Sequence, residues 1–343
     1  MHLGAYTRSR LIEVVAVAEL RSERRAIGER NRLRTYASAG EMLDAENLDI
    51  ACVLTPAAAH RAATEEIASH GVHVFCEKPM AVDLDDAHAM VAVCDRAGVR
   101  FCYGSSYRFL PAIARARDVV QAGVIGDVRL VVETAIGGRG REGHQPLSAA
   151  HYPVGGPGGS GMGLVDHGIH LMDIAPWLIG SEVVSVFGRG NISGAEPSPE
   201  LLVMFMASGA VGHLLYDDAT FCADLPTEGI FSWGRAWGID GSVGAERSWH
   251  PHPGSIAVYG TRGALRIFHY ANQLFLTTSA GQEQVRVADV AAPGHFALQM
   301  DAFAEAIRTG AQPPVTGADG IRALTVLLAV YESFARQAVV HLT

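Results

Sequence analysis

A lysine that follows an apolar run is the first candidate for chemistry in this sequence. Glu77-Lys78-Pro79 comes directly after residues 72–75, a β-branched and aromatic run typical of a strand. Parallel sheets bind ligands at the carboxyl ends of their strands, so we expect the Lys78 ammonium at a ligand-binding edge. Pro79 stiffens the exit from the strand, and the Glu77 carboxylate can keep the ammonium charged. A lysine in this position is more often a solvated charge, so a catalytic role requires a partner elsewhere in the chain.

We expect that partner in a cluster of titratable residues between positions 166 and 173. On a helix, Asp166 and His170 are four residues apart and share a face, and Asp173 follows His170 by three residues on the same face. A histidine between two carboxylates keeps one tautomer and titrates near neutral pH, which a general acid–base requires. The cluster therefore predicts a proton-transfer group centred on His170.

The same cluster allows two other interpretations. A helix face of this composition can also pair its own charges without any chemistry. Metal binding is the second alternative, with ligands from Asp166, His167, His170 and Asp173 and from His144 or His151. An ammonium is a poor neighbour for a bound cation, so we predict no metal here.

An acidic residue near the start of the chain indicates the cofactor. Glu19 ends the predicted strand at residues 12–18, where a carboxylate accepts hydrogen bonds from an adenosine ribose and repels a 2′-phosphate. We therefore expect NAD, although nearby arginines able to bind a phosphate leave NADP possible: Arg21, Arg24 and Arg25. Further cofactor-binding residues are predicted at the same edge of the sheet, namely Thr55, Pro56, His60, Glu77 and Lys78.

The first part of the chain alternates between strands and helices. Strands are predicted at residues 12–18, 50–54, 72–75 and 99–103, and helices lie between them, beginning for example at the caps Ser38 and Asp83. This alternation predicts a parallel, Rossmann-type sheet in an α/β fold. We assign residues 1–106 to a dinucleotide-binding domain.

Residues 107–343 have a different pattern and predict a second, α+β domain. Residues 128–135 and short segments from 183 to 278 read as strands of an open, mostly antiparallel sheet, and residues 164–179 read as a helix. The Gly-, Pro- and His-rich segment 137–163 is predicted to bind substrate, with Trp233, Trp237 or His250 contributing. The helical residues 297–338 are expected to pack back on the first domain.

Composition excludes several functional classes. The chain has 343 residues, 49% hydrophobic and 18% charged, with a net charge of −9, which disfavours a nucleic-acid partner. No apolar run is long enough to span a membrane and no signal peptide begins the chain. Five cysteines without CxxC spacing read as buried thiols of a reducing compartment, so we expect a cytoplasmic protein.

Taken together, these motifs resemble the glucose–fructose oxidoreductase/inositol dehydrogenase/MocA family over nearly the whole chain. The matching residues are, in order, Thr55-Pro56 with His60, Glu77-Lys78-Pro79, Tyr107-Arg108-Phe109 with Pro111, Gly123 and Gly126, Asp166-x-Gly168-x-His170-x-x-Asp173, and Tyr259-Gly260-Thr261-x-Gly263.

The resemblance implies hydride transfer between a nicotinamide cofactor and a carbinol or ketone of a sugar, inositol or related polyol. Lys78 would hydrogen-bond the reacting oxygen, His170 would move its proton, and Asp166 would position the substrate or the histidine. Arg108 and His151 would contact substrate hydroxyls. The open sheet implies a homodimer or homotetramer.

The resemblance fails at the first strand and its G-x-G-x-x-G loop, which should precede Ile12. Residues 1–11 contain neither, and His2 matches a histidine that follows the loop. The parallel sheet is then expected to have a gap, and the pyrophosphate to lose its helix N-terminus. A start upstream of Met1, a truncated chain or a natural loss of cofactor binding would each explain this. The last would fit an alternative function, a non-catalytic NAD-binding regulator or scaffold, but Lys78, Asp166 and His170 favour the enzyme.

Overall fold

The computed structural model describes residues 2–136, 163–190, 199–217, 256–269, 271–290 and 294–342. These residues form two compact units. The first contains residues 2–105 and 294–321, and the second contains the remaining described residues, beginning at Ser106. In the part of the chain that is described, no helix is both long and apolar enough to cross a membrane.

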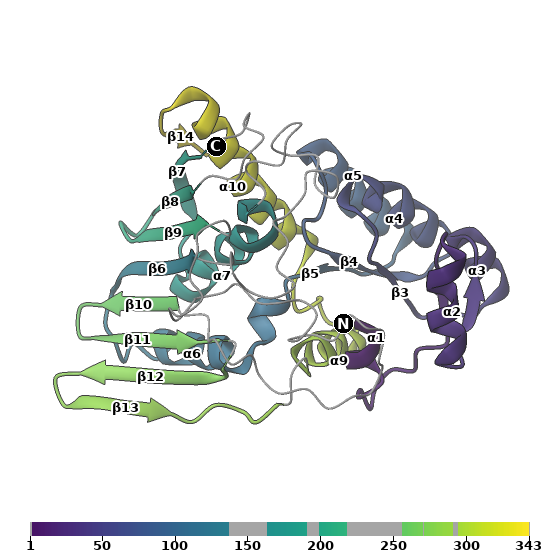
Figure 1. The fold of residues 1–343 in the computed structure, drawn as a ribbon, viewed down its shortest axis with the longest axis horizontal. Coiled ribbons are helices and arrows are strands. Elements are labelled where there is room, and N and C mark those ends of the chain that lie inside the picture. Colours follow the sequence, from purple (N-terminus) through teal and green to yellow (C-terminus); the bar gives the residue numbers. More distant parts are fainter. Residues whose placement is uncertain are drawn as a thin grey trace. The chain divides into compact units, whose positions relative to one another are not determined.

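The strands of the first unit are parallel, as predicted, and belong to two separate sheets (Figure 1). One sheet pairs β1 (Ala16–Ala18) with β2 (Arg34–Tyr36), and the other has the order β3 (Ile50–Val53), β4 (His73–Glu77), β5 (Phe101–Gly104). The five parallel strands therefore do not form one continuous sheet. The predicted strand at 12–18 was too long, because β2 offers only three residues for β1 to pair with.

Helices lie on both sides of the three-stranded sheet. Figure 1 shows α4 (His60–Ser69) and α5 (Leu84–Ala97) on one side and α1 (His2–Tyr6) and α9 (Gly294–Thr309) on the other. The shorter elements of this unit are α2 (Ser22–Arg30), α3 (Ala39–Ala45) and η1 (Ala57–Ala59). Both predicted caps are confirmed: Ser38 Oγ accepts from Glu41 N at 3.2 Å, and Asp83 Oδ1 accepts from Asp86 N at 2.8 Å.

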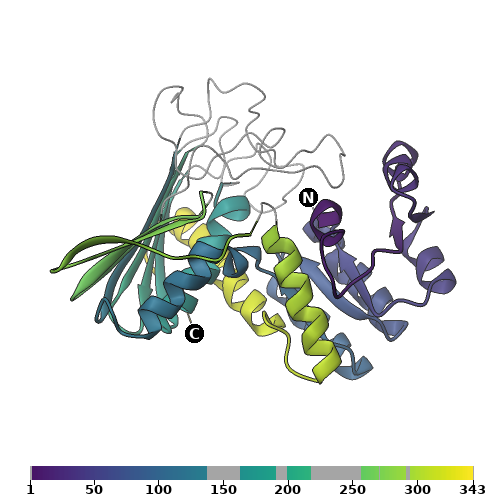
Figure 2. The ribbon, with the colours of Figure 1, turned by 90° about the horizontal axis from the view of Figure 1, so that it is seen from below.

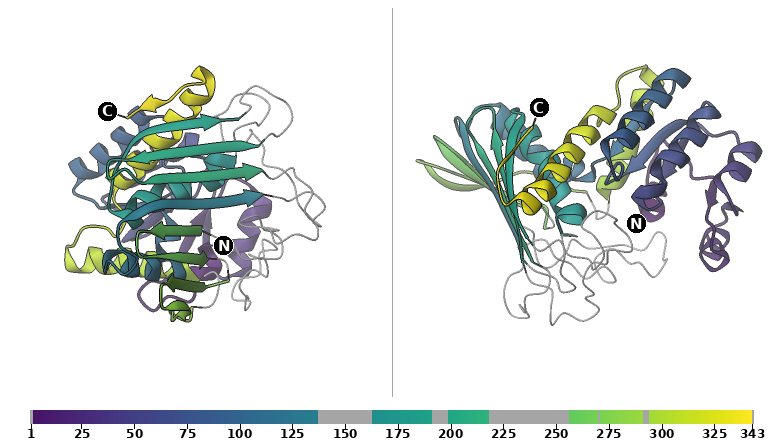
Figure 3. Two further views of the ribbon diagram at one scale, coloured as in Figure 1. Left: turned by 90° about the vertical axis from the view of Figure 1, so that its left-hand side faces the viewer. Right: turned by 90° about the horizontal axis from the view of Figure 1, so that it is seen from above.

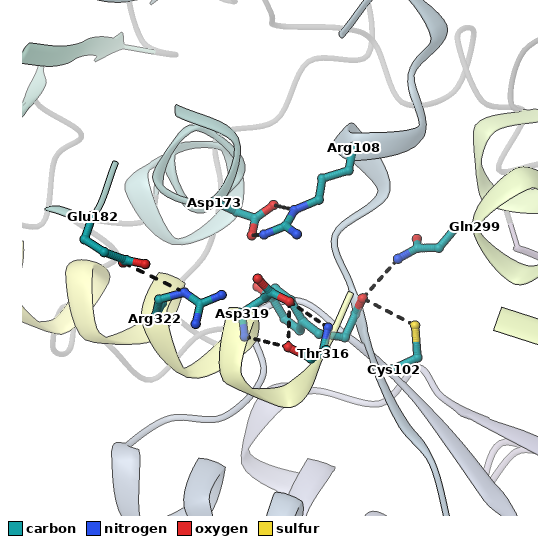
Figure 4. Close-up of polar contacts among 9 residues, drawn as sticks. Cys102, Arg108, Asp173, Glu182, Gln299, Thr316, Asp319 and Arg322 are labelled. Carbon is teal, nitrogen blue, oxygen red and sulfur yellow. Dashed lines mark hydrogen bonds and ion pairs between the residues drawn. The ribbon is translucent and has the colours of Figure 1, made fainter. Parts of the chain in front are cut away.

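Residues from the end of the chain are part of this first unit. Gln299, on α9, is fully buried and its Nε2 donates to the carbonyl oxygen of Tyr103 in β5 at 3.0 Å (Figure 4). The backbone N–H of Tyr103 donates to the carbonyl oxygen of Val315 at 3.0 Å. Thr316 and Asp319 then cap the start of α10 (Gly317–Arg336): the Asp319 N–H donates to Thr316 Oγ1 at 3.3 Å, and the Thr316 N–H donates to Asp319 Oδ2 at 2.8 Å. The two backbone groups of Tyr103 thus attach residues 294–321 to β5.

The second unit is built on a nine-stranded sheet that is mostly antiparallel, as predicted (Figure 3). One pair differs: β6 (Val128–Ile136) and β9 (Val211–Asp217) are parallel neighbours near the centre. From edge to edge the order is β13 (Gly281–Val285), β12 (Gln273–Thr278), β11 (Gly263–Phe268), β10 (Ile256–Gly260), β6, β9, β8 (Glu200–Met206), β7 (Val183–Arg189), β14 (Val340–His341).

The helices of this unit cover one face of the sheet (Figures 2 and 3). They are η2 (Ser106–Phe109), α6 (Pro111–Gln121), the π-helical turn η3 (Leu164–Gly168), α7 (Ile169–Ile179) and residues 322–336 of α10. Gly188 on β7 lets α10 approach closely, because a Cβ there would lie 2.3 Å from Val330 Cγ2 and 2.5 Å from Phe334 Cε1. A side chain at position 188 would therefore displace this helix.

A buried histidine at the start of α9 should make the stability of the protein depend on pH. Burial, together with the charge of nearby His2, lowers the pKa of His295 to about 3. An unfolded histidine has a pKa of about 6.5, so between these values only the unfolded chain binds the proton. The free energy of unfolding therefore falls as the pH decreases from about 6.5 towards 3.

We expect His295→Leu to flatten this dependence, by up to about 1.4 kcal/mol per pH unit. Urea unfolding at several pH values between 4.5 and 7 measures it. His88 is an exposed histidine of the same unit, and His88→Leu should keep the wild-type slope. An unchanged slope in His295→Leu would contradict the prediction.

Candidate active site

In the first unit, Lys78 follows β4 directly, beside the partly buried carboxylate of Glu77. The backbone N–H of Lys78 donates to Glu77 Oε2 at 2.9 Å, and His2 Nε2 lies 3.0 Å from Glu77 Oε1. Burial alone would raise the pKa of the Glu77 carboxyl, but the hydrogen bond and charge of His2 and the charge of Lys78 lower it below its usual value. Glu77 is therefore ionised and supplies a fixed negative charge next to the Lys78 ammonium.

His60 holds the Lys78 turn against the end of the neighbouring strand. Its Nε2 lies 2.7 Å from the carbonyl oxygen of Thr55, which follows β3, and its Nδ1 lies 3.1 Å from the carbonyl oxygen of Met80. Cys76 Sγ is 3.3 Å from the same Nδ1, and burial raises the pKa of this thiol, so the protonated S–H can donate to the ring. Since His60 is only 1% exposed, these contacts place the ends of β3 and β4 rather than present the ring to a ligand.

Glu19 directly follows β1, as predicted. Its Oε1 accepts from the backbone N–H of Arg21 at 3.0 Å and from Arg21 Nε at 3.3 Å. Partial burial acts to raise the pKa of this carboxyl, but the Arg21 hydrogen bonds and charge lower it overall. Arg25 Nη1 donates to the carbonyl oxygens of Glu19 and Leu20 at 2.7 and 2.8 Å. An ionised acceptor at the end of a parallel strand suits a ribose, so these residues fit the adenosine half of a dinucleotide.

In the second unit, an aromatic ring fixes the plane of His170. Asp166 lies in the π-helical turn η3, and His170 lies in the first turn of α7. The ring of Tyr107, from η2, stacks on the His170 imidazole with 3.9 Å between centroids and 5° between planes. π-helical turns are frequent at functional sites. The motif that contains Tyr107 in the sequence gives no sign of this contact.

Asp173 binds Arg108 in the structure (Figure 4). Arg108 Nε donates to Asp173 Oδ2 at 2.8 Å and Nη2 donates to Oδ1 at 2.5 Å, a bidentate pair that is almost fully buried. The Arg108 guanidinium also lies 5.3 Å from the ring centre of Trp177. Both Asp173 oxygens accept from Arg108, a pairing that the sequence did not predict, and the predicted place of Asp173 beside His170 stays a prediction. The contact between Arg108 and substrate hydroxyls stays a prediction.

Several predicted site residues lie outside the described residues: His144, His151, Trp233, Trp237, His250 and most of segment 137–163. Within the described residues, no group of three or more histidine, cysteine or acidic side chains could hold a metal ion. His167, considered above as a ligand, instead lies 3.0 Å from the buried Glu133 carboxylate.

Comparison with known proteins identifies the family. Residues 1–105 match the oxidoreductase family with an NAD-binding Rossmann fold, and residues 117–342 match the C-terminal α/β domain of that oxidoreductase family. The chain belongs to this family. The resemblance drawn from the sequence is therefore confirmed, the protein is an NAD(P)-dependent oxidoreductase, and the predicted cofactor, NAD, agrees with the family description.

Individual relatives include enzymes of sugar and inositol metabolism. The chain is 28% identical to D-apiose dehydrogenase of Paraburkholderia graminis over 97% of this chain and 84% of that protein. It is 28% identical to scyllo-inositol 2-dehydrogenase (NAD(+)) of Bacillus subtilis, over 86% of this chain and 78% of that protein. The aldose-aldose oxidoreductase of Caulobacter crescentus, solved with glycerol, has the same fold, with a TM-score of 0.78, 24% identity, and coverage of 100% of this chain and 95% of that one.

Proposed function

We propose that this protein transfers a hydride between NAD and a carbinol or ketone of a sugar, inositol or related polyol. Bound NAD would accept or supply the hydride. Lys78 hydrogen-bonds the reacting oxygen, His170 takes or gives its proton, and Asp166 positions the substrate or His170. Glu19, Thr55, Pro56 and Glu77 contribute to the cofactor site, and His60 contributes by holding the Thr55 and Met80 backbone. Arg108 and His151 contact substrate hydroxyls.

One observation carries this proposal: Lys78 is the only lysine in the chain, beside 26 arginines. Wherever a surface charge suffices, this sequence has arginine. Lysine differs by having a compact ammonium with three donors and a pKa that its surroundings can shift, which suits a group that binds a reacting oxygen. A sugar dehydrogenase and an inositol dehydrogenase among the relatives support the polyol class.

The test is cofactor binding followed by a substrate panel. We expect NADH to quench protein fluorescence or gain fluorescence on binding, with a lower Kd than NADPH because Glu19 repels a 2′-phosphate. Inositols and aldoses should then reduce NAD, whereas ethanol and propan-2-ol, which lack neighbouring hydroxyls, should not. The proposal fails if neither dinucleotide binds or if no polyol is oxidised.

We further propose that the protein is a homodimer or homotetramer joined through the open face of the nine-stranded sheet. No described helix covers this face (Figure 3). Directly paired residues on neighbouring strands point to the same face, and one such row contains Phe205, Val211, Leu130 and Tyr259. Phe205, Leu130 and Tyr259 are 36–41% exposed. So much exposed apolar surface in one row favours a partner that covers it. A second copy is the occupant we propose.

Leu130→Glu places a charge at the centre of this row. We expect it to reduce the assembly to smaller species, because burying an unpaired carboxylate costs several kcal/mol. Sedimentation velocity of the wild type and the variant measures this. Val124→Glu is a matched control, since Val124 is equally exposed (42%) but lies in the turn after α6. A monomeric wild type, or an unchanged assembly of Leu130→Glu, would refute the interface.

The cytoplasm is the location we propose. Among the described residues, Cys52, Cys76, Cys94 and Cys102 form no disulfide, which supports a reducing compartment.

A further inference from the structure

The carboxylate of Glu133, on β6 of the second unit, is buried on one face of the sheet among apolar side chains. Glu133 lies on β6 between Val131 and Ala135, which occupy the same face of the strand, and all three are at most 1% exposed. Moving a carboxylate out of water is costly unless it is paired. A buried ion pair is often no better for stability than an apolar replacement of the same size. The presence of Glu133 in this position therefore indicates a role other than stability.

Glu133 fixes the ring of His167. His167 Nε2 lies 3.0 Å from Glu133 Oε1 and donates a hydrogen bond to it, while His269 Nε2 lies 3.9 Å from the same oxygen. Burial acts to raise the pKa of Glu133, but the charge and hydrogen bond of His167, followed by the charge of His269, lower it overall. Burial lowers the pKa of His269 to about 4, so His167 is the principal partner at neutral pH. A carboxylate that accepts from one ring nitrogen sets both the tautomer and the orientation of the imidazole.

The ring of His167, oriented by Glu133, packs against the ring of Tyr107. The two rings meet edge to face, with centroids 6.2 Å apart and planes at 78°. Tyr107 also contacts His269 with centroids 5.4 Å apart, and it stacks on His170 at 3.9 Å. Tyr107 is 6% exposed, so its position is set by these neighbours. The chain of contacts runs from Glu133 through His167 and Tyr107 to His170.

We propose that Glu133 and His167 are positioning residues for His170, acting through Tyr107. His167, held by its hydrogen bond to Glu133, packs against the Tyr107 ring, and the Tyr107 ring holds the His170 imidazole in one plane. This inference rests on the proposed proton-transfer role of His170, but the geometry it describes can be tested separately from activity.

Histidine NMR tests the geometry directly. In protein labelled with ¹³C-histidine, the ring proton signal of His170 should lie upfield of the signals of exposed histidines, because it is shielded by the stacked Tyr107 ring; a His170→Asn variant assigns it. Glu133→Gln and His167→Asn should each move this signal downfield. The proposal is overturned if the wild-type signal is not shielded, or if both variants leave the signal unchanged. If both variants fail to fold, the wild-type spectrum alone is the test.

Kinetics test whether a displaced His170 slows the reaction. Glu133→Gln and His167→Asn should each lower kcat about 10- to 100-fold, as expected for a small displacement of a catalytic group. KM and the Kd for NADH should stay within about twofold of the wild type. His341→Asn is the matched control, since His341 is an exposed histidine of the same unit, on β14. A loss of thermal stability with unchanged kcat and an unchanged His170 signal would show a merely structural pair. If the NMR changes occur but the wild type oxidises no polyol, the proposed function fails and the positioning stands.

Discussion

Replacing His170 with alanine is expected to lower kcat by about 10²- to 10⁴-fold, the usual contribution of a general acid–base. The structure supplies two reasons for choosing this histidine among the fifteen of the chain. Its ring is held flat against Tyr107, which is buried, and it lies in the first turn of α7, directly after a π-helical turn. A proton-transfer group needs one defined orientation, and these contacts provide it.

The measurement separates chemistry from binding. Steady-state kcat and KM of His170→Ala are compared with the Kd for NADH, which should stay unchanged because the cofactor-binding residues we propose lie in the other unit. His341→Ala serves as the control for an exposed histidine of the second unit. Full activity of His170→Ala, with an unchanged melting temperature, would rule out His170 as the proton-transfer group.

The sequence predicts those features of the fold and the site that depend on residues close together in the chain, such as helix caps and the ends of strands. The caps Ser38 and Asp83 were found because a cap bonds to a residue three positions later. Glu77 and Lys78 were placed at the end of a strand because that strand is a short apolar run with a clear end. Glu19 was found in the same way, at the end of β1.

Contacts between distant residues could not be predicted in this way. Arg108 and Asp173 are 65 residues apart, and their pairing depends on how η2 and α7 pack. The parallel pairing of β6 with β9 depends on the path of the chain between them, for which the sequence has no local signal. Glu133 shows the same limit, because in the alternation of β6 it shares a face with Arg129, which favours an outward side chain, whereas the structure buries it. An acidic residue on the buried face of a strand requires a partner, and that partner proved to be His167.

Replacing Lys78 provides the most discriminating test, because the chain has no other lysine. We expect Lys78→Ala to lower kcat by about 10²- to 10³-fold, the loss typical of removing a donor to a reacting oxygen. Lys78→Arg is the decisive variant. A solvated charge would be served equally well by arginine, the residue that this chain uses at all 26 of its other basic positions apart from histidine. A donor aimed at one oxygen would not, because the guanidinium is larger, planar and fixed in its geometry.

Lys78→Arg should therefore lose on the order of 10²-fold in kcat while folding normally. Arg61→Ala is the control, since Arg61 is an exposed base of the same unit, paired with Glu65 and Asp86. Protein labelled with ¹³C-lysine adds a direct readout, as its single Cε signal belongs to Lys78 without further assignment. That signal should shift when a polyol binds to the NAD complex. Wild-type kcat in Lys78→Arg, together with an unmoved signal, would reduce Lys78 to a surface charge and remove the main support for the proposed mechanism.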